Sequence, residues 1–165
     1  MQLAIRRALP DDLEAIVRIY MADDKGGHGD VWSGETQPAY QRAMSAILAS
    51  PFNRLYVAVA DEVQKDTGRG LRSESGRIVG TFQLTLTPGL VGGGRTRATM
   101  EAVHVLPQER GSGIGASMVS HAVAEARAAG AATLQLTSSK KRLDAHRFYE
   151  RLGFAKSHEG FKLGL

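Results

Sequence analysis

The stretch TMEAVHVLPQERGSGIG, from Thr99 to Gly115, decides the fold, because it predicts a strand that runs through a glycine-rich turn into a helix. The residues after Gly115 keep a helical period, which places Met118, Ala122 and Ala126 on one face. The glycines therefore lie at a helix N-terminus, where the first backbone N–H groups have no helical partner and the helix dipole favours an anion. The stretch predicts a phosphate-binding turn, with an ordinary glycine turn as the alternative.

Two other phosphate-binding motifs fit this turn less well. A P-loop closes with Gly-Lys-Ser/Thr, whereas Gly115 is followed by alanine and serine. The dinucleotide fingerprint G-x-G-x-x-G/A is matched by Gly111, Gly113 and Ala116. That fingerprint also needs an acidic residue about 20 positions further on, where residues 137–139 are Thr-Ser-Ser. The chain that remains after the turn is also too short to complete a dinucleotide-binding half.

Composition bounds the class of protein. The chain has 165 residues, 42% of them hydrophobic and 23% charged, which predicts one globular domain spanning residues 1–165. No apolar run approaches the roughly 20 residues of a membrane span, so we expect a cytoplasmic protein. The absence of cysteine excludes disulfides, a thiolate metal site and a cysteine acyl-enzyme. The net charge of +4 suits an anionic ligand but does not decide between ligands.

Strand and helix periods alternate along the chain. Strands are expected at residues 3–7, 55–60, 77–87 and 133–137, besides the one before the glycines. Helices are expected from Pro10, from Thr36 as the capping residue, after the glycine turn, and over 144–152. Loops are expected at 23–34, 61–76 and 88–94, and the tail 154–165 can hold one or two final strands.

Two motifs resemble a known family. The first is Arg110 to Gly115, which fits Arg/Gln-x-x-Gly-x-Gly/Ala and follows a Val-x-Val strand and a proline. The second is the segment DAHRFYERLGF, from Asp144 to Phe154, which ends in Phe-Tyr-x-x-x-Gly-Phe. Both motifs, in this order, resemble the GNAT superfamily of N-acetyltransferases, and the order of elements extends the resemblance over the whole chain. Many relatives carry Asn at the position of Asp144; an ionised Asp cannot donate a hydrogen bond, so here it could cap the helix instead.

The resemblance implies an α/β fold with a central mixed, mostly antiparallel sheet flanked by helices. It implies acetyl-CoA as co-substrate, bound where two strands part so that backbone N–H groups face the thioester. It also implies direct transfer of the acetyl group to an amine in a ternary complex. The residues that would bind acetyl-CoA are Val103, His104, Val105, Arg110, Gly111, Ser112, Gly113, Ile114, Gly115, Ala116 and Phe148.

Acetyl transfer from a thioester to an amine needs a neutral amine, a polarised carbonyl and a proton for the thiolate. Tyr149 resembles the general acid of the family. A phenol with a pKa near 10 stays protonated at neutral pH and can therefore give its proton to a thiolate. The alternative is that Tyr149 is an aromatic residue packed in the core. Glu101 is the candidate base, directly or through water, because strand alternation places it on the face of Val103 and Val105. A solvated residue or an ion pair with a nearby Arg or Lys is the alternative for Glu101.

The loop between the first two helices usually covers the acceptor in proteins that resemble this one. Here it carries Asp23, Asp24 and Trp32 as candidate substrate-binding residues. Carboxylates attract a cation, so we expect a small amine, an amino acid or an amino-bearing antibiotic as acceptor. A flexible acidic loop without a binding role is the alternative.

Three further interpretations stay open. The five histidines show no HxxxH spacing, so we expect no metal. The basic run Lys140–Arg142 could hold the 3′-phosphate of CoA, form a solvated face, or bind nucleic acid in a DNA-binding regulator. A non-catalytic acyl-CoA sensor on the same fold is another alternative. Dimers are common among proteins that resemble this one, and the tail strands could supply a seam between two copies.

Overall fold

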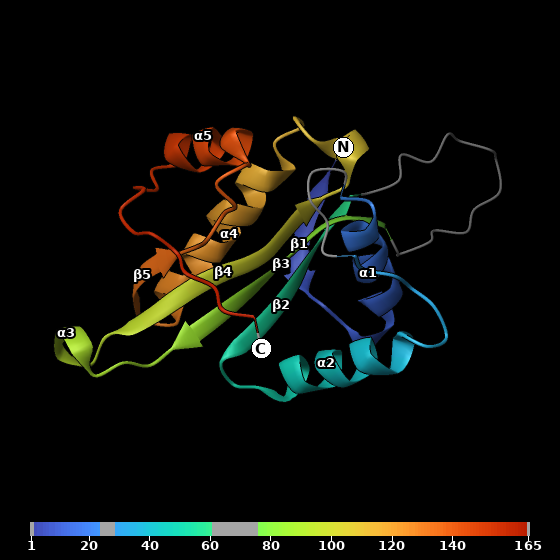
Figure 1. Cartoon of the computed structure of the whole chain (residues 1–165), viewed down its shortest axis with the longest axis horizontal. Coiled ribbons are helices and arrows are strands. Elements are labelled where there is room, and N and C mark those ends of the chain that lie inside the picture. Colours follow the sequence, from blue (N-terminus) through green and yellow to red (C-terminus); the bar gives the residue numbers. More distant parts are fainter. Residues whose placement is uncertain (1, 24–28, 61–75, 165) are drawn as a thin grey trace.

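The computed structural model describes residues 2–23, 29–60 and 76–164 (Figure 1). Its centre is a five-stranded sheet in the order β1-β2-β3-β4-β5. All neighbouring strands are antiparallel except β4 and β5, which are parallel. The strands are β1 Leu3–Arg7, β2 Asn53–Ala60, β3 Arg77–Thr87, β4 Thr96–Val105 and β5 Ala131–Gln135. The expected mixed, mostly antiparallel sheet is confirmed.

Helices cover both faces of this sheet (Figure 1). The longer ones are α1 Leu13–Met21, α2 Gln37–Ala49, α4 Ile114–Ala128 and α5 Leu143–Arg151. Short turns add η1 Pro10–Asp12, α3 Val91–Gly94 and η2 Pro107–Glu109. Helices α1 and α2 pack on one face and α4 on the other. No helix in the described part of the chain is long and apolar enough to span a membrane.

Strand alternation divides the core between these faces. On β2, Tyr56 and Ala58 point toward α4, whereas Leu55 and Val57 point toward α1 and α2. The α4 side of the core contains Phe82, Leu84, Met100, Met118 and Ala122. The other side contains Ile16, Met44, Leu55, Val57 and Val59. The sheet therefore has two apolar faces, which its helices bury.

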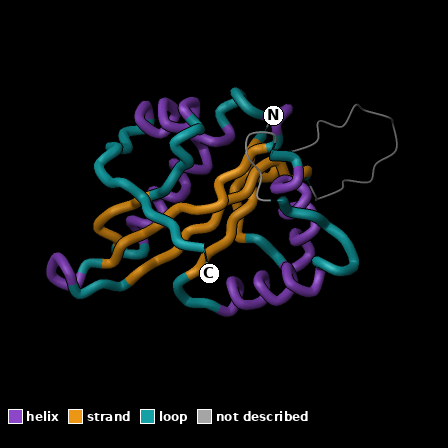
Figure 2. Tube along the Cα trace, in the orientation of Figure 1, coloured by secondary structure: helices purple, strands orange, loops and turns teal. Residues whose placement is uncertain are grey.

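The end of the chain differs from the expectation. Phe154 to Gly164 forms no strand, as the loop tube of Figure 2 shows, so the predicted final strands are wrong. Phe161 and Leu163 are 95% and 87% exposed. An alternating apolar pattern becomes a strand only where a neighbouring strand completes its backbone hydrogen bonds, and the described chain pairs none with this tail.

Two smaller expectations also need correction. Thr36 is the N-cap residue of α2, as expected, but its side chain makes no capping hydrogen bond, because its hydroxyl donates to the Val31 carbonyl at 2.6 Å. The strand expected at 133–137 begins and ends two residues earlier, so that β5 stops at Gln135. The polar segment 61–75 lies outside the described residues.

The start of α1 is held by Asp12, whose side chain is 9% exposed. Its carboxylate accepts hydrogen bonds from Arg6 Nη1 and Nη2 at 2.6 and 2.9 Å and from the Leu9 N–H at 2.7 Å. Burial acts to raise the pKa of Asp12, but the hydrogen bonds from Arg6 and Leu9 outweigh it and the pKa is lowered.

We expect Asp12→Asn to lower the free energy of unfolding by about 2 kcal/mol at neutral pH, because the buried carboxylate loses its charge-assisted hydrogen bonds from the partly exposed Arg6. A lowered folded-state pKa gives stability that is complete above the unfolded pKa of about 4 and is lost as pH falls through the folded value. The difference between wild type and variant in urea unfolding should therefore shrink in acid. Asp11→Asn, at the exposed neighbouring position, is the matched control and should change stability by less than about 0.5 kcal/mol; an equal loss in both variants would contradict the prediction.

Candidate active site

The glycine-rich turn lies between β4 and α4 and leaves open space above its backbone. Gly111 and Gly113 have φ angles of +83° and +89°, a region that other residues rarely adopt. A Cβ atom added at either position would meet no atom within 4 Å. Gly113 is the N-cap of α4, and its carbonyl accepts the first helical bond from the Ser117 N–H at 3.0 Å. The N–H groups of the first turn thus have no helical acceptor, and this arrangement fits an anionic group such as a pyrophosphate.

Beside this turn, β4 loses its neighbour on one edge. Pairing of β4 with β5 runs from Thr96 to Thr99 and ends at Gln135. Strand β4 continues to Val105, and within the described residues no strand pairs with that edge beyond Thr99. Backbone groups on such an edge require other partners. The structure therefore has the parting of strands that an extended ligand could line.

A β-bulge lies in the part of β4 that has left β5. On the β3 side, Gln83 pairs with Glu101 and Thr81 pairs with His104, so β4 contains one extra residue. Ala102, within the bulge, has a φ of +48° and is the described non-glycine residue with positive φ. An extra residue reverses the alternation of side chains beyond it. Glu101 and His104 therefore lie on the same face of the sheet, although three positions separate them.

The bulge corrects the expectation for Glu101. Val103 and Val105 pack into the core on the α4 side, whereas Glu101 faces the α1 side with His104. The Glu101 carboxylate is exposed and accepts a hydrogen bond from Thr85 Oγ1 at 3.2 Å. The prediction that Glu101 shares a face with the two valines is wrong, because simple alternation does not survive the extra residue.

Tyr149 lies on α5, half-buried between two other rings. Its ring centroid is 5.0 Å from that of Phe148 and 5.7 Å from that of Phe154. Burial raises the pKa of Tyr149, and the nearby positive charge of Arg142 opposes this rise only in part. A Cβ at Gly115 would lie 3.2 Å from the Phe148 ring, so α5 sits directly over the first turn of α4. Tyr149 therefore lies on the helix that packs over the first turn of α4, and its phenol is protonated at neutral pH.

Asp23 follows α1, and its carboxylate faces two guanidinium groups and an imidazole. Its side chain is 2% exposed and lies 3.2 Å from Arg110 Nη2, 3.5 Å from His104 Nε2 and 3.8 Å from Arg142 Nη1. One carboxylate therefore connects α1 to β4, to the glycine-rich turn and to the start of α5. The role of Asp23 in binding the acceptor stays a prediction, and in this structure its carboxylate contacts these three side chains of the protein. Asp24 lies outside the described residues.

The polar side chains of the turn are directed back onto the protein. Arg110 Nε donates to the Val105 carbonyl at 3.3 Å, in addition to its contact with Asp23. Ser112 Oγ donates to the Glu109 carbonyl at 2.5 Å. The surface that the turn offers to a ligand is therefore mainly its backbone.

The basic run before α5 is not one free patch. Lys140 forms an ion pair with Glu159 at 2.8 Å, and Arg142 contacts Asp23. Asp144 lies within the first turn of α5, where Arg142 is the N-cap, and pairs with Arg147. The interpretation that Asp144 caps the helix is therefore wrong, because Asp144 lies inside α5 and Arg142 is its N-cap.

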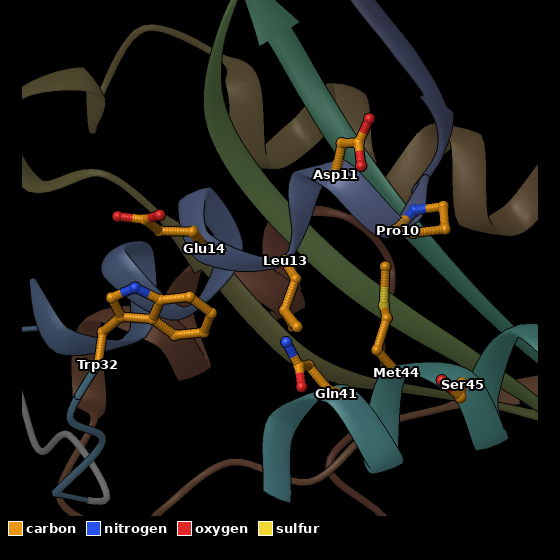
Figure 3. A pocket seen from close by; sticks show the side chains of 8 residues that line it. All are labelled: Pro10, Asp11, Leu13, Glu14, Trp32, Gln41, Met44 and Ser45. Atoms are coloured by element: carbon orange, nitrogen blue, oxygen red, sulfur yellow. The ribbon is translucent and has the colours of Figure 1, made fainter. Parts of the chain in front are cut away.

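Trp32 lies away from this site. It lines a hollow of about 360 Å³ between α1 and α2, together with Leu13, Gln41 and Met44 (Figure 3). None of the predicted cofactor-binding or catalytic residues borders that hollow. In the described ranges, no group of three or more His, Cys, Asp or Glu side chains gathers where a metal ion could be held.

The comparison with known proteins agrees with this geometry. The model of the Acetyltransferase (GNAT) family matches residues 43–154. The chain belongs to this family. The predicted GNAT membership is confirmed, and the match includes both sequence motifs.

Relatives of this GNAT chain have several descriptions. An aminoalkylphosphonate N-acetyltransferase of Salmonella typhimurium is 39% identical over 95 residues, which are 58% of this chain and 61% of that protein. A glucosamine 6-phosphate N-acetyltransferase of Trypanosoma brucei brucei is 39% identical over 85 residues, 52% of this chain and 55% of that protein. The chain thus spans little more than half the length of these curated relatives. A transcriptional regulator from Bacillus halodurans C-125 has a crystal structure with a TM-score of 0.84 and 38% identity, covering 99% of this chain and 100% of that one.

The sequence indicated where the site lies but not which of its side chains contact one another. The contact of Asp23 with Arg110 joins positions 87 residues apart. The contact with Arg142 joins positions even more distant in the chain. A single sequence contains no signal for such pairs, because each of these residues stands in a segment whose composition is typical of an ordinary polar loop.

Proposed function

We propose that this GNAT chain is an acetyl-CoA-dependent N-acetyltransferase that moves the acetyl group directly to a primary amine of a small molecule. The observation that carries the proposal is the glycine-rich turn at the N-terminus of α4, next to the place where β4 leaves β5. The backbone at Gly111 and Gly113 would hold the pyrophosphate, and the β4 edge from Val103 to Val105 would line the pantetheine arm. Acetyl-CoA supplies the activated acetyl group as a thioester.

Tyr149 is the proposed general acid. Its phenol is protonated at neutral pH. Because burial raises its pKa, the phenol stays protonated to a higher pH than that of an exposed tyrosine. It lies on α5, which packs over the start of α4 through Phe148 and Gly115. A proton donor in that place can protonate a thiolate leaving from a ligand bound at the turn. Glu101 stays a candidate base, now on the α1 face of the sheet.

The acceptor is proposed only as a class. Two relatives are named for acceptors that combine an amine with a phosphonate or a phosphate group. These compounds therefore join amino acids, simple amines and amino-bearing antibiotics as the first acceptors to test. A homodimer stays a prediction, and light scattering of the purified protein measures it directly.

The test is a calorimetric titration with acetyl-CoA, followed by a thiol assay of CoA release with a panel of acceptors. The panel contains 2-aminoethylphosphonate, glucosamine 6-phosphate, amino acids and an aminoglycoside. We expect micromolar acetyl-CoA binding and CoA release that depends on at least one amine. Binding of NAD in place of acetyl-CoA would contradict the proposal.

A second candidate function is regulation of transcription, and it is favoured by the description of the Bacillus halodurans relative. The same titration with a DNA duplex at several salt concentrations separates the two. Salt-dependent DNA binding together with acetyl-CoA binding, but without CoA release from any acceptor, would favour a regulator that senses acyl-CoA.

A further inference from the structure

His104 is a buried imidazole located just past the bulge in β4. Its side chain is 13% exposed, and its ring meets the Tyr20 ring edge-on with centroids 4.9 Å apart. It faces the α1 side of the sheet, beside the length of β4 that has left β5. This position borders the expected path of the thioester, on the face from which Glu101 also projects.

The two ring nitrogens of His104 have different surroundings. Nε2 lies 3.5 Å from Asp23 Oδ2. Nδ1 is buried and has no hydrogen-bond partner among the described residues. A buried polar atom without a partner is costly, and native proteins usually satisfy it with a water or a ligand. The carboxylate at Nε2 favours the tautomer that leaves a lone pair on Nδ1, as the acid of a catalytic triad does for its histidine.

The charges around His104 connect it to the proposed acid. Asp23 also contacts Arg110 of the glycine-rich turn and Arg142 at the start of α5. The positive charge of Arg142 in turn acts on Tyr149. These side chains therefore connect the imidazole on β4 to the phenol on α5.

His104 suits a proton-accepting role better than Glu101 does. An imidazole accepts and releases protons near neutral pH, whereas a carboxylate in water is a weak base there. Glu101 is exposed and held by Thr85. His104 is shielded from water and is oriented by Asp23.

We propose that His104 accepts the proton of the acceptor ammonium group, directly or through one water, and that Asp23 is its positioning residue. The inference rests on the proposed acetyltransferase function. The ammonium loses one proton to Nδ1, and the neutral nitrogen forms the bond to the acetyl carbon. As the carbon–sulfur bond breaks, the thiolate takes the proton of Tyr149. The second nitrogen proton restores Tyr149 through solvent, and His104 releases its own proton to water.

The test measures kcat and KM across pH for wild type, His104→Gln and Glu101→Gln with the best acceptor of the panel. We expect His104→Gln to lower kcat about 100-fold or more, to change the acetyl-CoA Kd less than about twofold, and to remove the limb of the kcat/KM profile near neutral pH. The loss should shrink with the aminooxy analogue of the same acceptor, whose nitrogen is already neutral and needs no base. A merely structural role would not distinguish the two acceptors.

Two further variants keep the test decisive. Asp23→Asn retains the imidazole but removes the carboxylate beside it, while Arg110 and Arg142 remain close. We therefore expect a smaller fall in kcat than in His104→Gln. His121→Gln is the matched control. Among the described residues, His121 also has a buried ring nitrogen, Nε2, without a hydrogen-bond partner. It lies near Tyr56 on the α4 face of the sheet, the opposite face from His104. It should leave the profile unchanged.

Three outcomes would overturn the inference while leaving the acetyltransferase function intact. One is an unchanged pH profile in His104→Gln. Another is an equal loss with the amine and its aminooxy analogue. The third is a neutral limb that disappears in Glu101→Gln instead. Absence of CoA release by the wild type with every acceptor would overturn the proposed function itself.

Discussion

Gly113→Val should abolish acetyl-CoA binding at concentrations where the wild type is saturated. Gly113 has a φ of +89°, and a β-branched residue there is strained by about 1–3 kcal/mol. The new side chain would also occupy the open space above the first turn of α4, where the backbone N–H groups would bind the anion. Together these effects predict a rise in the acetyl-CoA Kd of at least about 100-fold, which corresponds to roughly 3 kcal/mol. Isothermal titration measures it directly.

Gly130→Val separates strain from loss of the binding surface. Gly130 also has a positive φ, +73°, and a Cβ there would likewise meet no atom within 4 Å. It lies after the C-terminal end of α4, so the strain is similar but the anion-binding turn is untouched. We expect this variant to lose stability while retaining the wild-type Kd. If the two variants lost affinity equally, the turn would not be the pyrophosphate site.

Tyr149→Phe should lower kcat by about 100- to 10,000-fold, the usual contribution of general acid catalysis. The substitution removes one hydroxyl and retains the ring contacts with Phe148 and Phe154, so acetyl-CoA should bind as in the wild type. Burial raises the pKa of Tyr149 above its usual value near 10. The acid is therefore protonated through neutral pH, and on the alkaline side the wild-type kcat should decline only at high pH, as the phenol ionises.

Tyr56→Phe is the control for the loss of a tyrosine hydroxyl. Tyr56 is buried on the α4 side of the sheet and donates to Glu125 Oε2 at 2.5 Å, away from the glycine-rich turn. We expect it to lower the free energy of unfolding but to leave kcat near the wild-type value. Wild-type kcat in Tyr149→Phe would show that the thiolate takes its proton from another group.

Much of the fold was predictable because its elements follow local periodicity. The core face of α4 was expected from Met118, Ala122 and Ala126, and all three are buried. The glycine-rich turn was expected from Gly111 and Gly113, since glycine adopts positive φ values without a steric cost. The same reasoning wrongly predicted strands in the tail, because an alternating apolar pattern forms a strand only when a partner strand is present.

The site was predictable in its location but not in its internal contacts. The sequence by itself determined the turn, the strand before it and the ring pair on α5, because each depends on neighbouring residues. Only the tertiary structure decided which face Glu101 and His104 share, because the bulge at Ala102 reverses an alternation that local pattern assumes. It also decided that Asp23 is buried beside two guanidinium groups and an imidazole, since those contacts depend on how distant segments meet across the sheet.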